Sequence, residues 1–497
     1  MNAPKTSAGR TGLPPTSSTF PGDVETGAAS RTTPAPTGAG PGFDTLPLST
    51  AVLANLERLG YTRMTPVQAA TLPVTLAGRD LIAQAKTGSG KTAAFALPLL
   101  SRLDLRSYAV QAMVLCPTRE LAEQVAQEIR RLARAEDNVK VLTLCGGTTM
   151  RPQMASLAHG AHVVVGTPGR IIDHLSRETL SLDALDTLVL DEADRMLDMG
   201  FYEDIAGVIR MCPDERQTLL FSATYPEGVA KLGKRFMREP AEVTLEESHD
   251  TDRIRQRFYE VAPEERLRAV ARLLNHFRPE STLAFCNTKQ RCRELTAALQ
   301  AEGIVALELH GDLEQRDRDQ VLVRFANRSC SVLVATDVAA RGLDIAKLEA
   351  VINVDVAFET EVHTHRIGRT GRAGEAGWAF TLASPGEMER VGRIEKMQGA
   401  DCVWHGLEEL TPPPDGEPLR PPMVTLQLLG GKKEKIRPGD VLGALTKDLG
   451  FDGTKIGRIN VNDFSTYIAV DRSIAQAALR GLETGKVKGR SVKVRRI

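Results

Sequence analysis

The sequence lacks the features that mark membrane and exported proteins. It has no apolar run of the roughly eighteen residues that a membrane-spanning helix requires. Its N-terminus lacks the charged and then apolar pattern of a signal peptide. Its seven cysteines are odd in number and include no CxxC pair, so no disulfide framework is expected. These absences favour a cytoplasmic protein without a membrane anchor, whose cysteines are reduced core residues.

The formal net charge is zero, but the charges are unevenly distributed along the chain. Residues 423–497 contain 15 Lys and Arg against 7 Asp and Glu, whereas the preceding residues contain 48 against 56. A basic segment attached to a mildly acidic body indicates that the segment binds a polyanion. The alternative is a small packing domain with a solvated basic face.

Length and composition predict several domains. A chain of 497 residues is too long for one core, and typical domain sizes predict about three. Residues 1–40 are mostly Gly, Pro, Ser, Thr and Ala, which predicts a disordered tail. Residues 411–422 are Pro-rich and predict an extended linker before the basic segment.

Between tail and linker, short apolar runs alternate with helical patterns such as Leu121, Val125 and Ile129. Apolar runs without polar alternation are typical of parallel strands buried on both faces. The pattern occurs twice, over residues 41–246 and 253–410. We therefore predict an α/β fold with two tandem parallel-sheet domains, in which ligands bind beyond the carboxyl ends of the strands.

A glycine-rich segment follows the first apolar run. Its backbone amides and the helix after it suit a phosphate group, Lys91 can reach the β- and γ-phosphates, and the Thr92 hydroxyl can help to hold Mg²⁺. The first position is Ala where the general pattern has Gly. The alternative is a turn that only joins strand to helix. The candidate phosphate-binding residues are Ala85, Lys86, Thr87, Gly88, Ser89, Gly90, Lys91 and Thr92.

Two carboxylates stand at the end of a later apolar run, in the tetrapeptide 191–194. Asp191 is suited to hold Mg²⁺ largely through water, because Mg²⁺ gives up its hydration reluctantly. Glu192 is suited to orient and deprotonate an attacking water. An acidic surface turn is the alternative for this tetrapeptide alone, but its combination with the glycine-rich segment favours phosphoryl chemistry.

An arginine-rich segment lies in the second half of the chain, at residues 365–372. Arg369 and Arg372 are three apart, which predicts that they lie on one helical face. An arginine pair supplied from outside the phosphate-binding domain stabilises the charge of a phosphoryl-transfer transition state. Taken alone, the segment is also compatible with a solvated basic patch.

The motifs, in their order, resemble those of the DEAD-box helicase family over residues 43 to about 410. The resemblance rests on the following residues: Phe43, Gly60-Tyr61, Thr65 to Gln68, Pro117 to Ala122, Gly146-Gly147, Thr167 to Arg170, Asp191 to Asp194, Ser222 to Thr224, His310 to Asp312, Gln315 with Arg318, Ala335 to Asp344, and His365 to Arg372.

The resemblance implies two RecA-like domains that bind ATP and Mg²⁺ between them. It implies that Gln68 hydrogen-bonds the adenine edge and that Phe43 packs against the base, which selects ATP over GTP. It further implies that Asp344 contacts the ribose and that Arg369 and Arg372 reach the γ-phosphate. Domain closure is expected, because half of the ATP site then lies on the second domain.

The resemblance also implies an RNA path and a coupling element. Ser222 and Thr224 are implied to link the ATP site to strand separation. The residues implied to hold RNA do so through phosphate and sugar, without reading bases. They are Arg119, Gly147, Thr167, Gly169 and Arg170 in the first domain and Gln315, Arg318, Thr336 and Asp337 in the second.

The basic segment predicts a small α+β domain with the β-α-β-β-α-β order of an RNA-recognition motif (RRM). The predicted elements are a strand at 424–429, a helix at 438–449, strands at 456–461 and 466–470, a helix at 473–483 and a strand at 491–497. The RNP1 strand keeps only Tyr467 in register, so we expect basic loops and termini to bind RNA instead. They carry Lys432, Lys433, Lys435, Lys455, Arg458, Lys486, Lys488, Arg490, Lys493, Arg495 and Arg496.

This segment resembles the C-terminal domain of DbpA-type helicases in residues 436–440, 456–459 and 487–494. The resemblance implies that a monomeric enzyme anchors to a hairpin of large-subunit ribosomal RNA and remodels neighbouring helices during 50S assembly. The alternatives are an RNA chaperone without ribosomal specificity, an ATP-gated RNA clamp, and a DNA helicase. Intact Glu192, Thr224 and Arg372 argue against the clamp.

Overall fold

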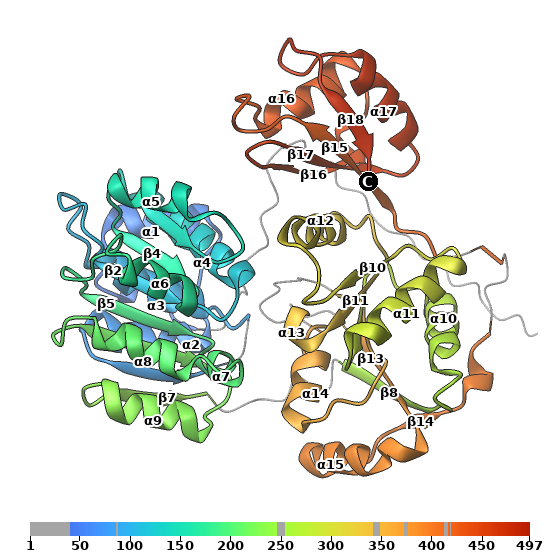
Figure 1. Ribbon diagram of the computed structural model, residues 1–497, viewed down its shortest axis with the longest axis horizontal. Coiled ribbons are helices and arrows are strands. Elements are labelled where there is room, and N and C mark those ends of the chain that lie inside the picture. The colour runs from blue at the N-terminus through green and yellow to red at the C-terminus, as the bar shows by residue number, and fades with distance from the viewer. Residues whose placement is uncertain are drawn as a thin grey trace, which may run out of the picture.

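The computed structural model describes residues 40–85, 88–245, 254–340, 348–371, 376–411, 416–417 and 419–497. Residues 1–39 of the predicted tail and part of the predicted linker lie outside the described residues. The described residues form three sheets in three domains (Figure 1). All seven cysteines are free thiols, and six of them are buried, as predicted. Among the described residues, no helix has both the length and the apolar character needed to cross a membrane.

The first domain is a parallel sheet with helices on both faces (Figure 1). Its strand order is β3-β4-β2-β5-β6-β1-β7. The strands are β1 (Leu81–Gln84), β2 (Ala112–Leu115), β3 (Val141–Leu144), β4 (Val163–Gly166), β5 (Thr187–Asp191), β6 (Gln217–Ser222) and β7 (Ala241–Thr244). The α-helices are α1 (Thr50–Arg58), α2 (Pro66–Leu76), α3 (Lys91–Ser101), α4 (Arg119–Leu132), α5 (Met150–Ala158), α6 (Pro168–Ser176), α7 (Ala193–Asp198), α8 (Tyr202–Arg210) and α9 (Glu227–Phe236), with 3₁₀ turns η1 (Phe43–Thr45) and η2 (Ala133–Ala135).

The apolar runs of this sheet form strands because both faces are covered. Along β6, Leu219 and Phe221 belong to one core cluster and Leu220 to the cluster on the opposite face. Both faces of the strand are therefore apolar, which explains the absence of polar alternation. In α4, the apolar stripe is buried, and the Thr118 hydroxyl caps the helix by accepting a hydrogen bond from the Leu121 amide. The predicted helix is confirmed.

The second domain repeats this architecture, with strand order β10-β11-β9-β12-β13-β8-β14, again all parallel. The strands are β8 (Ile254–Glu260), β9 (Thr282–Cys286), β10 (Ala306–Leu309), β11 (Val332–Thr336), β12 (Ala350–Asn353), β13 (Gly377–Ala383) and β14 (Trp404–His405). The helices are α10 (Arg266–Phe277), α11 (Lys289–Ala301), α12 (Gln315–Ala326), α13 (Asp337–Ala340), α14 (Thr360–Ile367) and α15 (Met388–Gln398), with turns η4 (Pro385–Glu387) and η5 (Leu407–Glu409). The predicted α/β fold with two parallel-sheet domains is confirmed.

The C-terminal domain is an antiparallel sheet in the order β16-β17-β15-β18, with helices on one face. The strands are β15 (Met423–Leu429), β16 (Ile456–Val461), β17 (Thr466–Asp471) and β18 (Lys493–Arg496). The helical elements are α16 (Pro438–Gly443), a π-helical turn η6 (Ala444–Asp448), η7 (Gly453–Lys455) and α17 (Ala475–Thr484). The predicted β-α-β-β-α-β order is confirmed.

The open face of this sheet lies against the second domain, next to the end of α12 (Figure 1). Thr425 is fully buried. Its hydroxyl accepts a hydrogen bond from the side-chain Nδ2 of Asn327 at 3.2 Å and shares another with the Ser329 hydroxyl at 2.6 Å. The Met423 amide donates to the Arg328 carbonyl at 3.2 Å. The face that most RRMs use to stack bases is therefore an intramolecular contact here.

Candidate functional site

The glycine-rich loop connects β1 to α3. Gly88 and Gly90 have φ of 85° and 94°, a conformation that glycine adopts without strain. A Cβ on Gly90 would also lie 2.6 Å from Gln68 Nε2. Gly90 caps α3 without a side-chain hydrogen bond, so the helix presents uncapped amides to a ligand. Lys86 and Thr87 lie outside the described residues.

Ala85 and Lys91 occupy the two ends of this loop. Ala85 is not among the residues with positive φ, so its Cβ causes no strain and Gly is not required there. Its amide donates to the Ser222 carbonyl at 2.8 Å. The Lys91 ammonium is buried and has no hydrogen-bond partner among the described residues. A buried cation without a partner is costly, so this position suits an anionic ligand.

Asp191 stands at the carboxyl end of β5, opposite the lysine. It is 3% exposed, and its Oδ1 has no hydrogen-bond partner among the described residues. Burial raises the pKa of Asp191 to about 6, although the Lys91 ammonium opposes the shift. The next residue, Glu192, has φ of 53°, a strained conformation for a residue with a Cβ. Its carboxylate accepts a hydrogen bond from Arg195 Nη1 at 2.8 Å.

Asp194 joins the acidic tetrapeptide to the segment after β6. Its Oδ2 accepts hydrogen bonds from the Thr224 amide and hydroxyl, both at 2.9 Å, and from the Ala223 amide at 3.2 Å. The Ser222 hydroxyl in turn accepts from the Asp194 amide at 3.2 Å. The structure thus places Ser222 and Thr224 in direct contact with the acidic tetrapeptide.

The adenine-sensing residues of the resemblance lie beside the glycine-rich loop. Gln68 is 1% exposed; its Oε1 accepts from the Thr65 amide at 2.9 Å and its Nε2 donates to the Gly90 carbonyl at 3.1 Å. The Thr65 hydroxyl accepts from the Gln68 amide at 3.4 Å, and this bond and the one from the Thr65 amide to Gln68 Oε1 form a capping box at the start of α2. Phe43 is buried and meets the ring of Tyr61 edge to face, with centroids 6.1 Å apart.

The arginine segment differs from the prediction. Helix α14 ends at Ile367, because the Thr370 hydroxyl bonds the Leu348 carbonyl and draws the following chain toward the sheet. Arg369 lies beyond the helix end, so the prediction that Arg369 and Arg372 share a helical face is wrong. Arg372 and Asp344 themselves lie outside the described residues.

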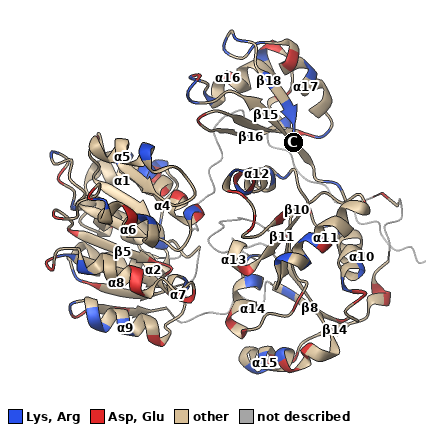
Figure 2. Cartoon of the chain, in the orientation of Figure 1, with Lys and Arg blue, Asp and Glu red and all other residues tan. Residues whose placement is uncertain are grey.

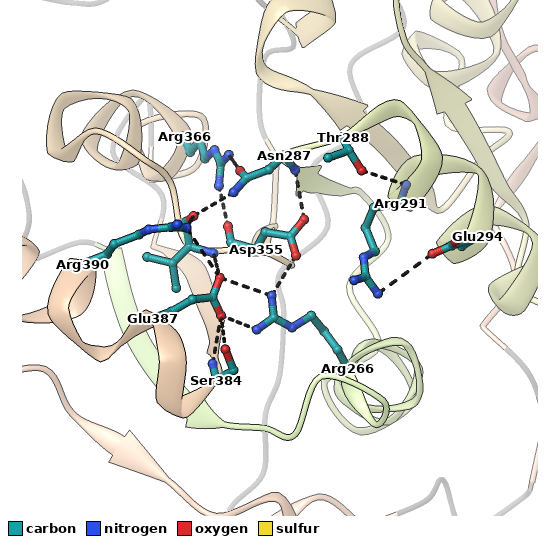
Figure 3. A network of polar contacts seen from close by, with 11 residues as sticks. Arg266, Asn287, Thr288, Arg291, Glu294, Asp355, Arg366, Ser384, Glu387 and Arg390 are labelled. Atoms are coloured by element: carbon teal, nitrogen blue, oxygen red, sulfur yellow. Dashed lines mark hydrogen bonds and ion pairs between the residues drawn. The ribbon is translucent and has the colours of Figure 1, made fainter.

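Arg366, also in this segment, is held by several hydrogen bonds (Figure 3). Its Nε and Nη2 donate to the two carboxylate oxygens of Asp337, each at 2.7 Å. Nη1 donates to the Asp355 carbonyl and Nη2 also to Asn287 Oδ1, again at 2.7 Å. The side chain is 1% exposed. Arg366 is therefore a fixed link between α14 and Asp337, the residue expected to contact RNA.

One pocket is lined by residues of both the first and the second domain. Arg195 of the first domain lines it together with His365 and Arg369 of the second. Burial lowers the pKa of His365 to about 4, and the positive charge of Arg195 contributes to the shift. The two domains therefore approach one another at the tetrapeptide and the arginine segment, as the resemblance implies.

The expected RNA-binding residues of both domains also meet. A Cβ built on Gly147 would lie 3.4 Å from Arg119 Nη1 and 3.5 Å from Gln315 Oε1. Arg318 Nε donates to Glu120 across the domain boundary, while its Nη2 donates to the Ala339 carbonyl at 2.7 Å. The first-domain and second-domain residues thus form one surface.

Other expected RNA-binding residues lie at strand ends. Thr167 follows β4 and caps α6 without a side-chain hydrogen bond, and a Cβ on Gly169 would meet open space. The Arg170 guanidinium is used within the protein, since it donates to Gln153 Oε1 and the Thr148 carbonyl, both at 3.0 Å. Thr336 ends β11 and is nearly buried.

Four residues in these contacts had no role in the sequence-based prediction: Glu120, Asp194, Arg195 and Arg366. Glu120, Asp194 and Arg366 lie inside recognised motifs, and Arg195 directly follows one, so part of the signal was present. Their role, however, is to position a neighbour rather than to contact a ligand. Only the fold shows which neighbour that is.

The C-terminal domain carries exposed basic side chains on its loops and on β18. Arg495 of β18 reaches the sheet face, where its Nε donates to Gln427 Oε1 at 2.7 Å. Tyr467 is 8% exposed, and its hydroxyl accepts from Gln427 Nε2 at 3.1 Å, so a base cannot stack on it in this arrangement. Figure 2 shows Lys and Arg on the loops and along β18. Two turns, 432–435 and 487–490, lie side by side, because the Lys488 ammonium donates to the Lys435 carbonyl. Lys455, Lys486, Lys488 and Arg490 are all exposed.

Comparisons with known proteins agree with this geometry. The chain matches the family models of the DEAD/DEAH box helicase over residues 65–232, the helicase conserved C-terminal domain over 265–374 and the DbpA RNA binding domain over 425–496. It is 53% identical over 450 residues to ATP-dependent RNA helicase DbpA of Escherichia coli, covering 90% of this chain and 97% of that one.

More distant relatives share the core. DEAD-box ATP-dependent RNA helicase CshA of Geobacillus kaustophilus is 44% identical, over 76% of this chain and 80% of that one. Among solved structures, S. cerevisiae Dbp5 bound to RNA and ADP BeF3 aligns with a TM-score of 0.68 at 30% identity, covering 74% of this chain and 96% of that one. The chain belongs to the DEAD-box family of ATP-dependent RNA helicases, in the group with a DbpA RNA-binding domain, and is an ATPase.

Proposed function

We propose that this helicase acts on large-subunit ribosomal RNA, which it binds through residues 423–497 and remodels locally during 50S assembly. The observation that carries the proposal is the match of residues 425–496 to the DbpA RNA-binding domain, on a segment with eight more basic than acidic side chains. The sheet face of this domain is occupied by the second RecA-like domain. RNA is therefore bound by the exposed basic turns.

This arrangement divides recognition between two surfaces. Glycines, hydroxyls and arginines of the core contact phosphate and sugar, which carry no sequence information. Preference for one RNA comes from the C-terminal domain. Because that domain packs against the second RecA-like domain, RNA on its basic turns is held at a set position relative to the duplex that the core opens.

The ATP site is proposed to work as the family pattern describes. Lys91 holds the phosphates, and Thr92 and Asp191 hold Mg²⁺, largely through water. The fit rests on the buried Lys91 ammonium and Asp191 carboxylate oxygen, which have no partner among the described residues. When bound by these residues, Mg²⁺ would supply positive charge that neutralises the phosphates. Glu192, held by Arg195, orients and deprotonates the attacking water.

The remaining contacts complete the nucleotide and RNA sites. Gln68 and Phe43 select adenine, Arg369 stabilises the γ-phosphate, and Ser222 and Thr224 couple hydrolysis to strand separation. Asp344 and Arg372, outside the described residues, are proposed to contact the ribose and the γ-phosphate. RNA is held by Arg119, Gly147, Thr167, Gly169, Arg170, Gln315, Arg318, Thr336 and Asp337, and on the C-terminal domain by Lys455, Lys486, Lys488 and Arg490.

The enzyme is proposed to act as a monomer in the cytoplasm. Both halves of its ATP site lie on one chain, since Arg195 and Arg369 line the same pocket. Its free thiols agree with a reducing compartment.

RNA-stimulated ATPase activity tests the proposal. The full-length protein and a variant without residues 423–497 are each titrated with ribosomal RNA and with unrelated RNA of equal length. Full-length protein should need roughly tenfold less ribosomal RNA for half-maximal stimulation, and the truncated protein should not distinguish the two. Equal stimulation of the full-length enzyme by both RNAs would show a general RNA chaperone instead.

A further inference from the structure

Beneath Arg366 lies a second buried arginine, Arg266, at the start of α10 (Figure 3). It is 4% exposed, its Nη1 donates to Asp355 Oδ1 at 2.7 Å, and its Nη2 donates to Glu387. The other oxygen of Asp355 accepts from the Asn287 amide at 2.9 Å. Arg266 thus fixes the side chain of Asp355. The backbone carbonyl of the same residue accepts the hydrogen bond from Arg366 Nη1.

Glu387 is held from several sides as well. It accepts hydrogen bonds from the Ser384 amide and hydroxyl, at 2.9 and 2.8 Å, and from the Val356 amide at 3.3 Å. Burial alone would raise the pKa of Glu387, but Arg266 and Ser384 hold it below its ordinary value. Glu387 is therefore a carboxylate in a fixed place, and it anchors Arg266.

These contacts join elements that are far apart in sequence into one polar network, which consists of Arg266, Asn287, Asp337, Asp355, Arg366 and Glu387. Arg266 begins α10, Asn287 follows β9, Asp355 follows β12, and Glu387 ends η4. These elements converge at the carboxyl ends of the strands, directly behind α14. Of the network residues, only Asp337 and Arg366 belong to motifs of the family pattern.

A gain in folding stability does not by itself explain why buried charges occupy these positions. Burying charges costs desolvation free energy, and well-packed apolar residues often stabilise a core as much or more. What a hydrogen-bonded charge network does well is to fix geometry, because arginine presents its donors in a rigid fork. Here the network fixes the position of Arg366. Arg366 donates two hydrogen bonds to Asp337, and it lies near the end of α14, three residues before Arg369.

We propose that Arg266, with Asp355 and Glu387, forms a positioning unit that sets Arg366 and so keeps the RNA-contacting Asp337 in register with Arg369 of the ATP site. The unit links RNA binding to ATP hydrolysis within the second RecA-like domain. The inference rests on the proposed RNA contact of Asp337. Arg266 and Glu387 touch neither ligand and act through Arg366.

The test uses full-length Arg266→Gln and Glu387→Gln, with Arg393→Gln as control. Arg393 pairs with Glu389 on the surface of α15, where both side chains are exposed. RNA half-saturation, kcat at saturating RNA and KM for ATP are measured at a temperature where each variant is folded. Both network variants should raise RNA half-saturation about tenfold and lower kcat several-fold, because Asp337 and Arg369 shift together. KM for ATP should change less than twofold, because Lys91 and Gln68 lie on the first domain.

A double variant tests whether Arg266 and Glu387 act as one unit. Arg266→Gln/Glu387→Gln should raise RNA half-saturation no more than the stronger single variant, as coupled residues do. Unchanged RNA half-saturation in folded variants would overturn the proposal. So would equal rises in RNA half-saturation and KM for ATP, because those indicate a general loss of structure. If Arg266→Gln does not fold, the RNA half-saturation of Glu387→Gln alone tests the proposal.

Asp337→Ala separates this inference from the proposed RNA contact. It should raise RNA half-saturation at least as much as Arg266→Gln. If Asp337→Ala has no effect, the RNA contact is wrong, and with it the link that Arg266 is proposed to maintain. If Asp337→Ala has its effect while Arg266→Gln and Glu387→Gln have none, only the positioning unit is wrong.

Discussion

Asp194 Oδ2 accepts hydrogen bonds from both the amide and the hydroxyl of Thr224, each at 2.9 Å. The contact joins the turn after β5, which carries Asp191 and Glu192, to the segment after β6. A displacement of the acidic turn 191–194 would therefore reach Thr224 directly. Both segments sit at the carboxyl ends of adjacent parallel strands, where the fold gathers its ligand-binding residues.

Thr224→Val should separate ATP hydrolysis from strand separation. Valine keeps the shape of the side chain but loses the hydroxyl that bonds a carboxylate, a bond worth about 1.5–3 kcal/mol. Duplex unwinding should fall about tenfold, while RNA-stimulated ATPase activity stays within about threefold of wild type. Thr75→Val, which removes a buried hydroxyl bonded only within α2, is the control. Parallel loss of both activities would argue against a coupling role.

Glu192→Gln should retain binding and lose chemistry. The glutamine carbonyl can still accept the hydrogen bond of Arg195, so the turn keeps its shape, but it cannot take a proton from water. ATP hydrolysis at saturating RNA should fall by about 10² to 10⁴. RNA release in the presence of ATP should slow, because the closed state persists. Wild-type turnover in this variant would remove Glu192 from the catalytic role.

Acid should destabilise the second RecA-like domain through His363. Burial, assisted by the charge of Arg366, lowers the pKa of His363 from 6.5 to about 4. Between these values the unfolded chain binds a proton that the folded protein does not, so the free energy of unfolding falls as pH drops through this window. The loss is at most about 3 kcal/mol for this group.

Thermal unfolding at pH 7.5 and pH 5 measures this effect. His363→Phe, which places a neutral ring beside Phe258, should reduce the difference between the two pH values. Part of the difference should remain, because the pKa of His365 is also lowered by burial, to about 4. His159→Gln, a change at an exposed histidine, should keep the wild-type difference. If His363→Phe also keeps it, His363 is not the acid-sensitive group.

The sequence predicted the fold of the first domain well, because it depends on local patterns. Apolar runs and helical spacing identify parallel strands and helices, and the ligand-facing residues follow the strands directly. The prediction failed at Arg369 and Arg372, where three-residue spacing suggested one helical face. The helix ends at Ile367, because a tertiary bond from Thr370 to Leu348 redirects the chain. Spacing alone cannot show such a bond.

Contacts between distant segments were also beyond sequence reasoning. The RNP1 strand has Ser465 where an aromatic residue is usual and Asp463 where Lys or Arg is usual. These substitutions predicted that bases do not stack on the sheet, but they did not indicate what lies there. The structure places the second RecA-like domain on that face, through Asn327 and Ser329. A face that packs against protein has no need of base-stacking aromatics, which gives the substitutions a physical reason.

The final prediction tests which surface of the C-terminal domain binds RNA. Lys488→Glu/Arg490→Glu reverses two exposed charges on the turn 487–490. In the full-length protein it should raise half-saturation by ribosomal RNA at least tenfold, and it should lower the slope of log affinity against log salt by about 2, since two phosphate contacts are lost. Tyr467→Ala should change half-saturation by no more than about twofold, because the ring is covered in the folded protein.

The matched control is Lys447→Glu/Arg480→Glu, which makes the same change of charge at exposed positions on the helical side of the domain. It should weaken RNA binding much less, because net charge acts over distance and is screened, whereas phosphate contacts are local. If the control weakens binding as much as the turn variant, only overall charge attracts RNA. If Tyr467→Ala weakens binding most and leaves the salt slope intact, the domain must leave the second RecA-like domain and bind bases with its sheet face, as other RRMs do.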